Sequence, residues 1–152
     1  MDCLVKLYDL PQLDDNSGKI IFRRVMAYER TQLIDWVKSK FGSNWSDECS
    51  VAFTSQPISC FVAIKNGNIL GFACYDCTQK NFFGPMGVED KYRNLGVGSR
   101  LLIASLHAMK NNGYAYAIIG SCGDQLNFYS KIVDAIPIEG STPGIYSNRI
   151  QS

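Results

Sequence analysis

A short glycine-containing segment, Arg93-Asn94-Leu95-Gly96-Val97-Gly98, separates an apolar run from a stretch with helical spacing. Glycines allow a backbone to pass close to a bulky anion and to direct successive amide N–H groups toward it. The helix expected to follow would place the positive end of its dipole at the same position. The segment therefore predicts a site for a cofactor that carries a pyrophosphate.

Two common phosphate-binding loops do not account for this segment. The dinucleotide fingerprint needs a third glycine three residues after the second, and Leu101 occupies that position. The nucleotide-triphosphate loop needs Gly-Lys-Ser/Thr, whereas Gly98-Ser99-Arg100 lacks the lysine. A plain strand–turn–helix connection with a glycine-rich bend is the structural alternative.

The segment resembles the Arg/Gln-x-x-Gly-x-Gly/Ala loop of the GCN5-related N-acetyltransferases, which binds the pyrophosphate of acetyl-coenzyme A. The similarity begins at Val88 and continues through Ser99-Arg-Leu-Leu102. Residues 59–74 are similar to the central hairpin of that family, and residues 124–131 to its Phe-Tyr-x-Lys helix, so the resemblance covers about residues 20 to 136. One departure is Val133-Asp134-Ala135, where the family often has a Gly-Phe pair.

The resemblance implies acetyl-coenzyme A-dependent transfer of an acetyl group to a primary amine by direct attack. It assigns Tyr129 as the acid that protonates the leaving thiolate. The backbone around Val88 would pair with the pantetheine arm and polarise the thioester carbonyl. The expected cofactor-binding residues are Met86, Gly87, Val88, Arg93, Asn94, Leu95, Gly96, Val97, Gly98, Ser99, Asn127 and Phe128.

A general base for the amine cannot be chosen from the sequence. Four acids are expected near the cleft, Glu48, Asp76, Glu89 and Asp124, and no spacing singles one out. Two non-enzymatic alternatives stay open for this reason. One is an acyl-coenzyme A sensor without turnover, and the other is an interaction module that uses residues 1–18 as its contact.

The composition is that of one globular domain with no strong charge. The chain has 152 residues, 46% of them hydrophobic, and 15 basic against 14 acidic residues. A net charge of +1 favours neither a nucleic acid nor a membrane surface as partner. The expected partner is a small-molecule or peptide amine, with a homodimer as the default assembly.

Six cysteines, together with an N-terminus that does not resemble a secretory leader, predict a reducing, cytoplasmic setting. Cys74 and Cys77 form a C-x-x-C pair. Structural zinc needs four ligands, and the remaining cysteines are scattered along the chain. Packing within a strand is therefore the favoured interpretation, and no metal is expected.

The spacing of apolar residues predicts an α/β fold. We expect an N-terminal extension (1–18) and a domain (19–152) with strands at 19–26, 60–64, 69–75, 81–88 and 114–119. Helices are expected at 28–41, 97–112 and 124–132, with a short one within 44–55 and a last pair of strands around Ile136 and Ile145. The resemblance implies a mixed, mostly antiparallel sheet with helices on both faces, splayed near Pro85.

Overall fold

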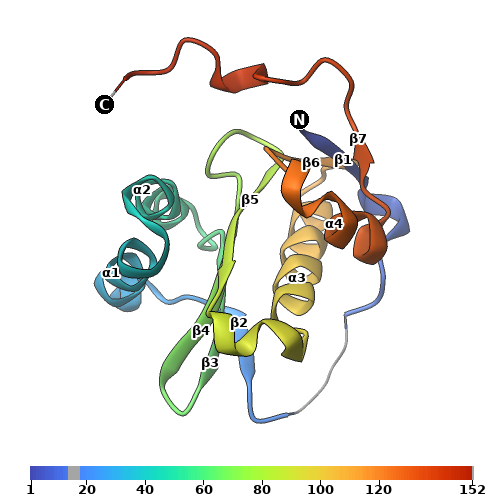
Figure 1. Cartoon of the computed structure of the whole chain (residues 1–152). Helices are drawn as coiled ribbons and strands as arrows, with labels where there is room; N and C mark the ends of the chain where they lie inside the picture. The colour runs from blue at the N-terminus through green and yellow to red at the C-terminus, as the bar shows by residue number, and fades with distance from the viewer. Residues whose placement is uncertain (14–17, 152) are drawn as a thin grey trace.

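A seven-stranded sheet forms the centre of the protein in the computed structural model, which describes residues 1–13 and 18–151 (Figure 1). The strand order is β2-β3-β4-β5-β6-β1-β7, and among the described residues only β5 and β6 pair in parallel. The strands are β1 (Cys3–Lys6), β2 (Ile21–Arg24), β3 (Cys60–Lys65), β4 (Asn68–Tyr75), β5 (Phe82–Val88), β6 (Tyr116–Ile119) and β7 (Ile136–Pro137). The α-helices are α1 (Arg30–Phe41), α2 (Ser43–Val51), α3 (Val97–Asn111) and α4 (Leu126–Val133).

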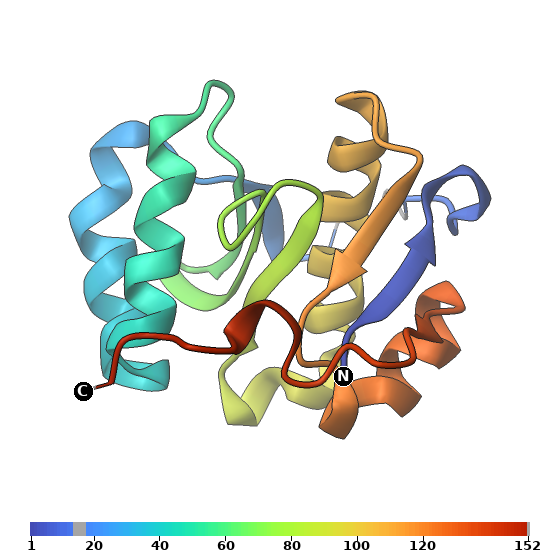
Figure 2. The same cartoon turned by 90° about the horizontal axis from the view of Figure 1, so that it is seen from above.

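Helices cover both faces of the sheet, as predicted. Helices α1 and α2 lie on one face, and α3 and α4 lie on the other (Figures 1 and 2). Two apolar clusters fill the spaces between these layers, one centred on Leu33, Val37 and Phe72 and the other on Leu101, Leu102 and Leu106. The side chains of all six are fully buried. This burial holds the helices against the sheet because it removes apolar surface from water.

Local turn residues set the ends of these elements where the sequence predicted them. Gly42 ends α1 with a φ of 98°, a conformation that other residues rarely adopt. The β3–β4 hairpin turns at Asn66 and Gly67, whose φ angles are 52° and 77°. Two consecutive positive φ angles match the twist that a two-residue hairpin requires.

Strands β5 and β6 separate shortly after they meet. Their parallel pairing is limited to Phe82 with Ile118 and Phe83 with Ile119, whereas the rest of β5 pairs with β4 alone among the described strands. The divergence begins at Gly84, as the position of Pro85 predicted. A proline has no N–H for a strand ladder and so marks the place where pairing can stop.

Both ends of the chain differ from expectation. Residues Cys3–Lys6 do not form an extension but an inner strand, β1, between β6 and β7, because Cys3 and Val5 are fully buried and the backbone pairs with Tyr116–Ile119. The expected residues 14–17 of that extension lie outside the described part. The predicted terminal strand pair is wrong: Ile136 is in the two-residue β7, and Ile145 is in a short 3-10 helix.

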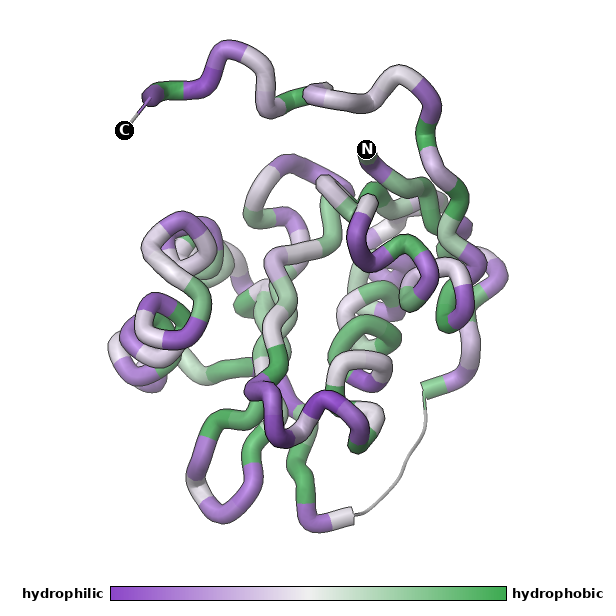
Figure 3. The backbone as a smooth tube through the Cα atoms, in the orientation of Figure 1, coloured by the Kyte–Doolittle hydropathy of each residue, from purple (hydrophilic) through white to green (hydrophobic). Residues whose placement is uncertain are grey.

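The turn that leads from β5 into α3 is polar. Figure 3 shows a mostly hydrophilic turn at residues 89–94, between the end of β5 and the start of α3.

No helix within residues 1–13 and 18–151 combines the length and apolar character needed to cross a membrane.

Candidate active site

The gap between β5 and β6 opens into the main cavity of the protein, with a volume of about 830 Å³. Its walls come from the end of α1 with α2, the turn before β5 together with the splayed part of that strand, the loop before α3, the segment from β6 into α4, the C-terminal tail and Met1. The lining residues include Phe41, Glu48, Thr78, Met86, Gly87, Val88, Arg93, Gly96, Gly98, Ser99, Ser121, Phe128, Tyr129 and Tyr146.

The loop before α3 presents a set of backbone donors to this cavity. Gly96 has a φ of 74° and is the N-cap of α3, and a side chain there would be strained although space is available. The carbonyl of Gly96 accepts its bond from Arg100, so the N–H groups of residues 97–99 belong to the unpaired first turn of the helix. Because Gly96, Gly98 and Ser99 line the cavity, these donors and the helix dipole lie at its edge.

The register of β5 directs two further N–H groups toward the gap. Glu89 donates its N–H to Leu70 across the ladder at 2.8 Å, and Gly87 lies opposite Phe72. Alternate residues of an antiparallel strand address the same neighbour. The N–H groups of Met86 and Val88 therefore point away from β4, toward the side where β6 has separated.

Gly87 also has a packing role that the loop motif did not predict. A Cβ atom at this position would lie 2.5 Å from the ring of Phe41, which is closer than real Cβ contacts. The ring, at the end of α1, therefore lies directly on the β5 backbone. Phe41 lines the cavity as well and forms one side of it.

Tyr129 lies in the cavity wall, on α4. Its side chain is 8% exposed, and its ring meets Phe83 and Phe128 edge-on at centroid distances of 6.3 and 5.2 Å. Burial raises the pKa of Tyr129 to about 12 because the phenolate would lose most of its hydration. The hydroxyl is thus neutral, and able to donate a hydrogen bond, throughout the physiological pH range.

The structure brings most, but not all, of the predicted residues to the cavity. Met86, Gly87, Val88, Arg93, Gly96, Gly98, Ser99, Phe128 and Tyr129 line it. Val97 is fully buried in the core, and Leu95 is 61% exposed. Asn94 and Asn127 are exposed and are not part of the wall. Asn127 precedes Phe128 on α4, and a helical step of 100° turns it away from the cavity.

The cationic residues around the loop have different positions. Arg93 lines the cavity, donates from Nε to the carbonyl of Val88 at 3.4 Å and pairs with Asp90 at 3.2 Å. Arg100 lies over the ring of Phe22 at 4.0 Å. Lys91 lines a separate hollow of about 280 Å³ beside the same loop. Positive charge is therefore present on both sides of the loop.

The tertiary structure distinguishes the four acids. Glu48 is half-buried in the cavity wall and accepts a hydrogen bond from Thr78. Asp76 is engaged by the Asn81 backbone at 2.8 Å and the Tyr114 hydroxyl at 3.2 Å. Glu89 pairs with Lys40 outside the main cavity.

Asp124, the fourth acid, is exposed and does not contribute to the wall. Glu48 is therefore the one acid of the four that lines the main cavity.

The C-terminal tail, where the sequence predicted only a strand, closes the far end of the cavity. Figures 1 and 2 show this tail crossing from β7 toward α2. The Tyr146 hydroxyl lies so close to Gly120 that a Cβ there would be 2.7 Å away. Burial raises the pKa of Tyr146, and the charges of Glu48 and Asp2 raise it further, against a hydrogen bond with Ser121 that lowers it.

Asp2 fastens the tail to the segment between β6 and α4. Asp2 is 7% exposed. Its carboxylate accepts a hydrogen bond from the backbone N–H of Ser121 at 3.0 Å, and its own backbone N–H donates to the hydroxyl of Ser141 at 2.8 Å. One step along, Cys3 forms a disulfide with Cys122, with α-carbons 6.3 Å apart. Two of the six cysteines are therefore oxidised, which differs from the reducing setting expected; a cytoplasmic location stays a prediction.

Solved structures of acetyltransferases share this fold. A GCN5-related glucosamine N-acetyltransferase region of a fungal multi-domain β-N-acetylglucosaminidase matches with a TM-score of 0.65 and 16% identity, over 87% of this chain and 19% of that one. A GCN5-related N-acetyltransferase from Sphaerobacter thermophilus matches with a TM-score of 0.58 and 16% identity, over 78% of this chain and 40% of that one. This chain thus spans less than half of either protein.

An aminoglycoside acetyltransferase from an uncultured soil metagenomic sample, solved with trehalose, is of similar size. It matches with a TM-score of 0.56 and 13% identity, over 76% of this chain and 88% of that one. At such identities these structures establish the fold alone. No relative is found among curated protein sequences.

The family itself is established by the sequence pattern over most of the domain. Residues 30–131 match the model of the acetyltransferase (GNAT) family, a stretch that includes α1, the β3–β4 hairpin, the splayed β5, the loop with its helix α3, and Tyr129. The chain therefore belongs to the acetyltransferase (GNAT) family, and this membership supports an acyltransferase activity.

Proposed function

We propose that this protein transfers the acetyl group of acetyl-coenzyme A to a primary amine by direct attack. The observation that carries the proposal is that the unpaired amides of the α3 N-terminus and Tyr129 border one cavity. The amides suit a pyrophosphate, and the tyrosine suits a leaving sulfur.

The cofactor would enter along the open edge of β5. Its pyrophosphate would accept hydrogen bonds from the N–H groups of residues 97–99, with Arg93 adding positive charge nearby. Its amide-containing arm would pair with the N–H groups that point away from β4, as an added strand does. The N–H of Val88 would then lie beside the thioester carbonyl and stabilise the oxyanion that forms there.

Tyr129 would act on the sulfur as that atom becomes negative. A thiol has a pKa of about 8.5, so full proton transfer from a phenol of pKa about 12 costs roughly 5 kcal/mol at equilibrium. The hydroxyl therefore stabilises the departing thiolate chiefly as a hydrogen-bond donor. The proton that finally neutralises the sulfur comes from the amine nitrogen, which becomes strongly acidic once it has attacked the carbonyl.

Glu48 would bind the acceptor amine at the far end of the cavity. A lysine-like amine has a pKa near 10.4, so its neutral form costs about 4.6 kcal/mol at pH 7. A carboxylate in the wall attracts the cationic form and can accept its proton, directly or through water. The half-buried position of Glu48, held by Thr78, is suited to this role.

The experiment is a two-step measurement on the intact chain. Calorimetry with coenzyme A and acetyl-coenzyme A measures binding, and chromatography then follows free coenzyme A released in the presence of polyamines, amino acids, aminoglycosides and lysine peptides. Amine-dependent release with acetylated product in the mass spectrum supports the proposal. Binding without release on any amine favours an acyl-coenzyme A sensor, and absence of binding favours an interaction module.

A matched pair of variants tests whether Glu48 contacts the acceptor. We expect Glu48→Gln to raise KM for the amine or lower kcat by about tenfold or more, with the affinity for coenzyme A unchanged. Glu89→Gln is the control, because Glu89 pairs with Lys40 outside the cavity. Equal effects of the two substitutions would remove Glu48 from the mechanism.

A further inference from the structure

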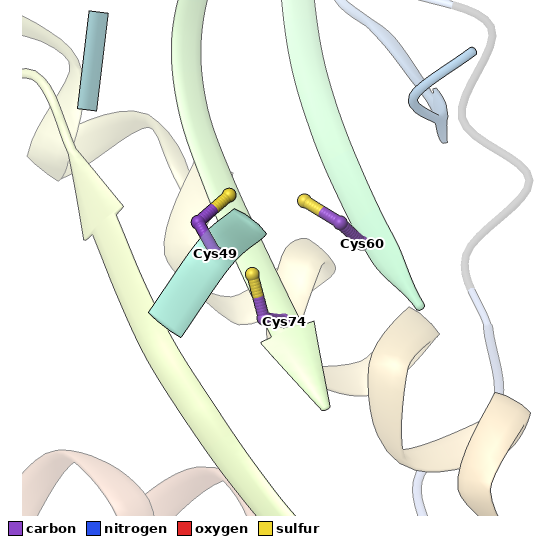
Figure 4. Close-up of side chains that lie close together, drawn as sticks. All are labelled: Cys49, Cys60 and Cys74. Carbon is purple, nitrogen blue, oxygen red and sulfur yellow. The ribbon is translucent and has the colours of Figure 1, made fainter. Parts of the chain in front are cut away.

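Three buried thiols meet on the sheet face opposite α3. Cys49 comes from α2, Cys60 from the start of β3 and Cys74 from β4, and each has no exposed surface. Their sulfur atoms all lie within 4.8 Å of one another. Figure 4 shows the three side chains converging on one space from three elements. The sequence placed these cysteines 11 and 14 residues apart and so gave no sign of this cluster.

The separation of the sulfurs is close to what a single metal ion requires. For metal–sulfur bonds of about 2.3 Å, a trigonal ion places its three sulfurs roughly 4.0 Å apart. The three thiols would therefore need to move inward by only a fraction of an ångström. Cys60 and Cys74 are register partners on adjacent strands, which fixes their relative positions, and all three are free thiols rather than disulfides.

The surroundings favour a three-coordinate, soft ion over zinc. The three cysteines belong to a buried apolar cluster that also contains Leu33, Val62 and Phe72. Within the described residues, no histidine or carboxylate joins these three thiols in a cluster close enough to hold one ion. Structural zinc takes four protein ligands, so three thiols leave it one ligand short, whereas Cu(I) is among the ions that soft thiolates select.

Cys77 lies outside this group, although its thiol interacts with that of Cys74. Its thiol donates to the carbonyl of Tyr75 at 3.4 Å and contacts the Ser59 hydroxyl at 3.8 Å.

We propose that Cys49, Cys60 and Cys74 form a three-thiol binding site for one soft, thiophilic metal ion, with Cu(I) as the occupant that its coordination number fits. The ion would join α2 to β3 and β4. It would lie behind the acceptor end of the cavity, because Glu48 precedes Cys49 on α2 and the partner of Glu48, Thr78, follows Cys77. This site is independent of the cofactor loop.

The test uses the intact chain with its disulfide preserved. Cu(I) is supplied anaerobically with ascorbate, which does not reduce disulfides, in competition with a chromogenic Cu(I) chelator. We expect one ion per chain, near-ultraviolet thiolate charge-transfer absorption, and the luminescence of Cu(I) shielded from water. Zn(II) in a parallel arm should compete poorly; displacement of Cu(I) by Zn(II) would overturn the assignment of coordination number.

Single substitutions separate the cluster from its neighbour. Cys60→Ala should weaken Cu(I) binding at least about a hundredfold, and Cys49→Ala and Cys74→Ala should do the same. Cys77→Ala removes another buried free thiol and should bind as the wild type does. Equal affinity of Cys60→Ala and the wild type, or no binding by the wild type beyond the competitor, would show thiols that only pack in the core.

A second measurement covers variants that fail to fold. Wild-type protein in mild denaturant is alkylated with and without Cu(I), and the modified cysteines are mapped by mass spectrometry. The proposal requires Cu(I) to protect Cys49, Cys60 and Cys74 together, and to raise Tm of the wild type and of Cys77→Ala. Uniform labelling of all four free cysteines with and without the ion would refute it.

Discussion

Replacing Tyr129 with phenylalanine tests the proposed chemistry at a single atom. The ring packs edge-on against Phe83 and Phe128 and is 8% exposed, so the phenylalanine ring keeps these contacts and only the hydroxyl is lost. One donor to a developing negative charge in a protected site contributes about 2–4 kcal/mol. We therefore expect kcat to fall roughly 30- to 1000-fold, with the affinity for acetyl-coenzyme A nearly unchanged.

The pH dependence sharpens this prediction. Because burial holds the pKa of Tyr129 at about 12, the hydroxyl stays neutral from about pH 6 to pH 10. The ratio of wild-type to variant kcat should be constant over that range. The assay is chromatographic measurement of free coenzyme A at saturating cofactor with the best amine from the panel, together with calorimetry for the binding constant.

Tyr114→Phe is the matched control. Its hydroxyl donates to Asp76 at 3.2 Å, and the residue does not line the main cavity. The same chemical change should leave kcat within about twofold, although stability can fall by about 1 kcal/mol. A kcat for Tyr129→Phe within twofold of the wild type, or the same loss in both variants, would refute the role of Tyr129 at the sulfur.

Three further predictions concern stability and the cofactor loop. The pKa of Tyr129 is about 12 in the folded state and about 10 in the unfolded chain. Its contribution to the free energy of unfolding is therefore complete below pH 10 and is lost as the pH rises toward 12. Between these pH values the free energy of unfolding should fall by about 3 kcal/mol less in Tyr129→Phe than in the wild type, as measured by urea unfolding at each pH. Gly96→Ala should lower the free energy of unfolding in urea by about 1 kcal/mol because of the positive φ at this position. A Cβ at Gly98 would make only ordinary contacts at 3.7 Å, so Gly98→Ala should fold normally and bind coenzyme A about tenfold more weakly. Equal stability of the two variants would contradict the role of the positive φ at Gly96. Gly87→Ala should destabilise the fold by about 1–3 kcal/mol through its clash with Phe41, and adding Phe41→Leu should recover part of that loss, so additive costs in the double variant would be evidence against the contact.

Much of the framework follows from local sequence. Gly42, Asn66 and Gly67 end a helix and turn a hairpin because their backbones accept positive φ angles, and this preference needs no tertiary partner. Gly96 likewise marks the start of α3, and the residues around it carry the family resemblance that the match over residues 30–131 confirms. Pro85 marks the splay because it has no donor for a ladder.

Side-chain placement around the site depended on tertiary structure. Glu48 and Asp124 are equivalent acids in the sequence, and only the packing of α2 beside the splayed strand puts Glu48 into the wall. Asn127 was expected beside the cofactor, but its exposed position follows from how α4 rotates to bury Tyr129.

The remote pairings were also invisible to local patterns. A four-residue strand at Cys3–Lys6 is too short for its pattern to indicate which strand it pairs with. The disulfide joins Cys3 to Cys122, which lies 119 residues further along the chain. The thiols of Cys49, Cys60 and Cys74 meet only because two strands pair and a helix packs across them. Backbone preferences act between neighbours along the chain and so can be read from the sequence, whereas contacts between distant residues exist only after the layers have packed.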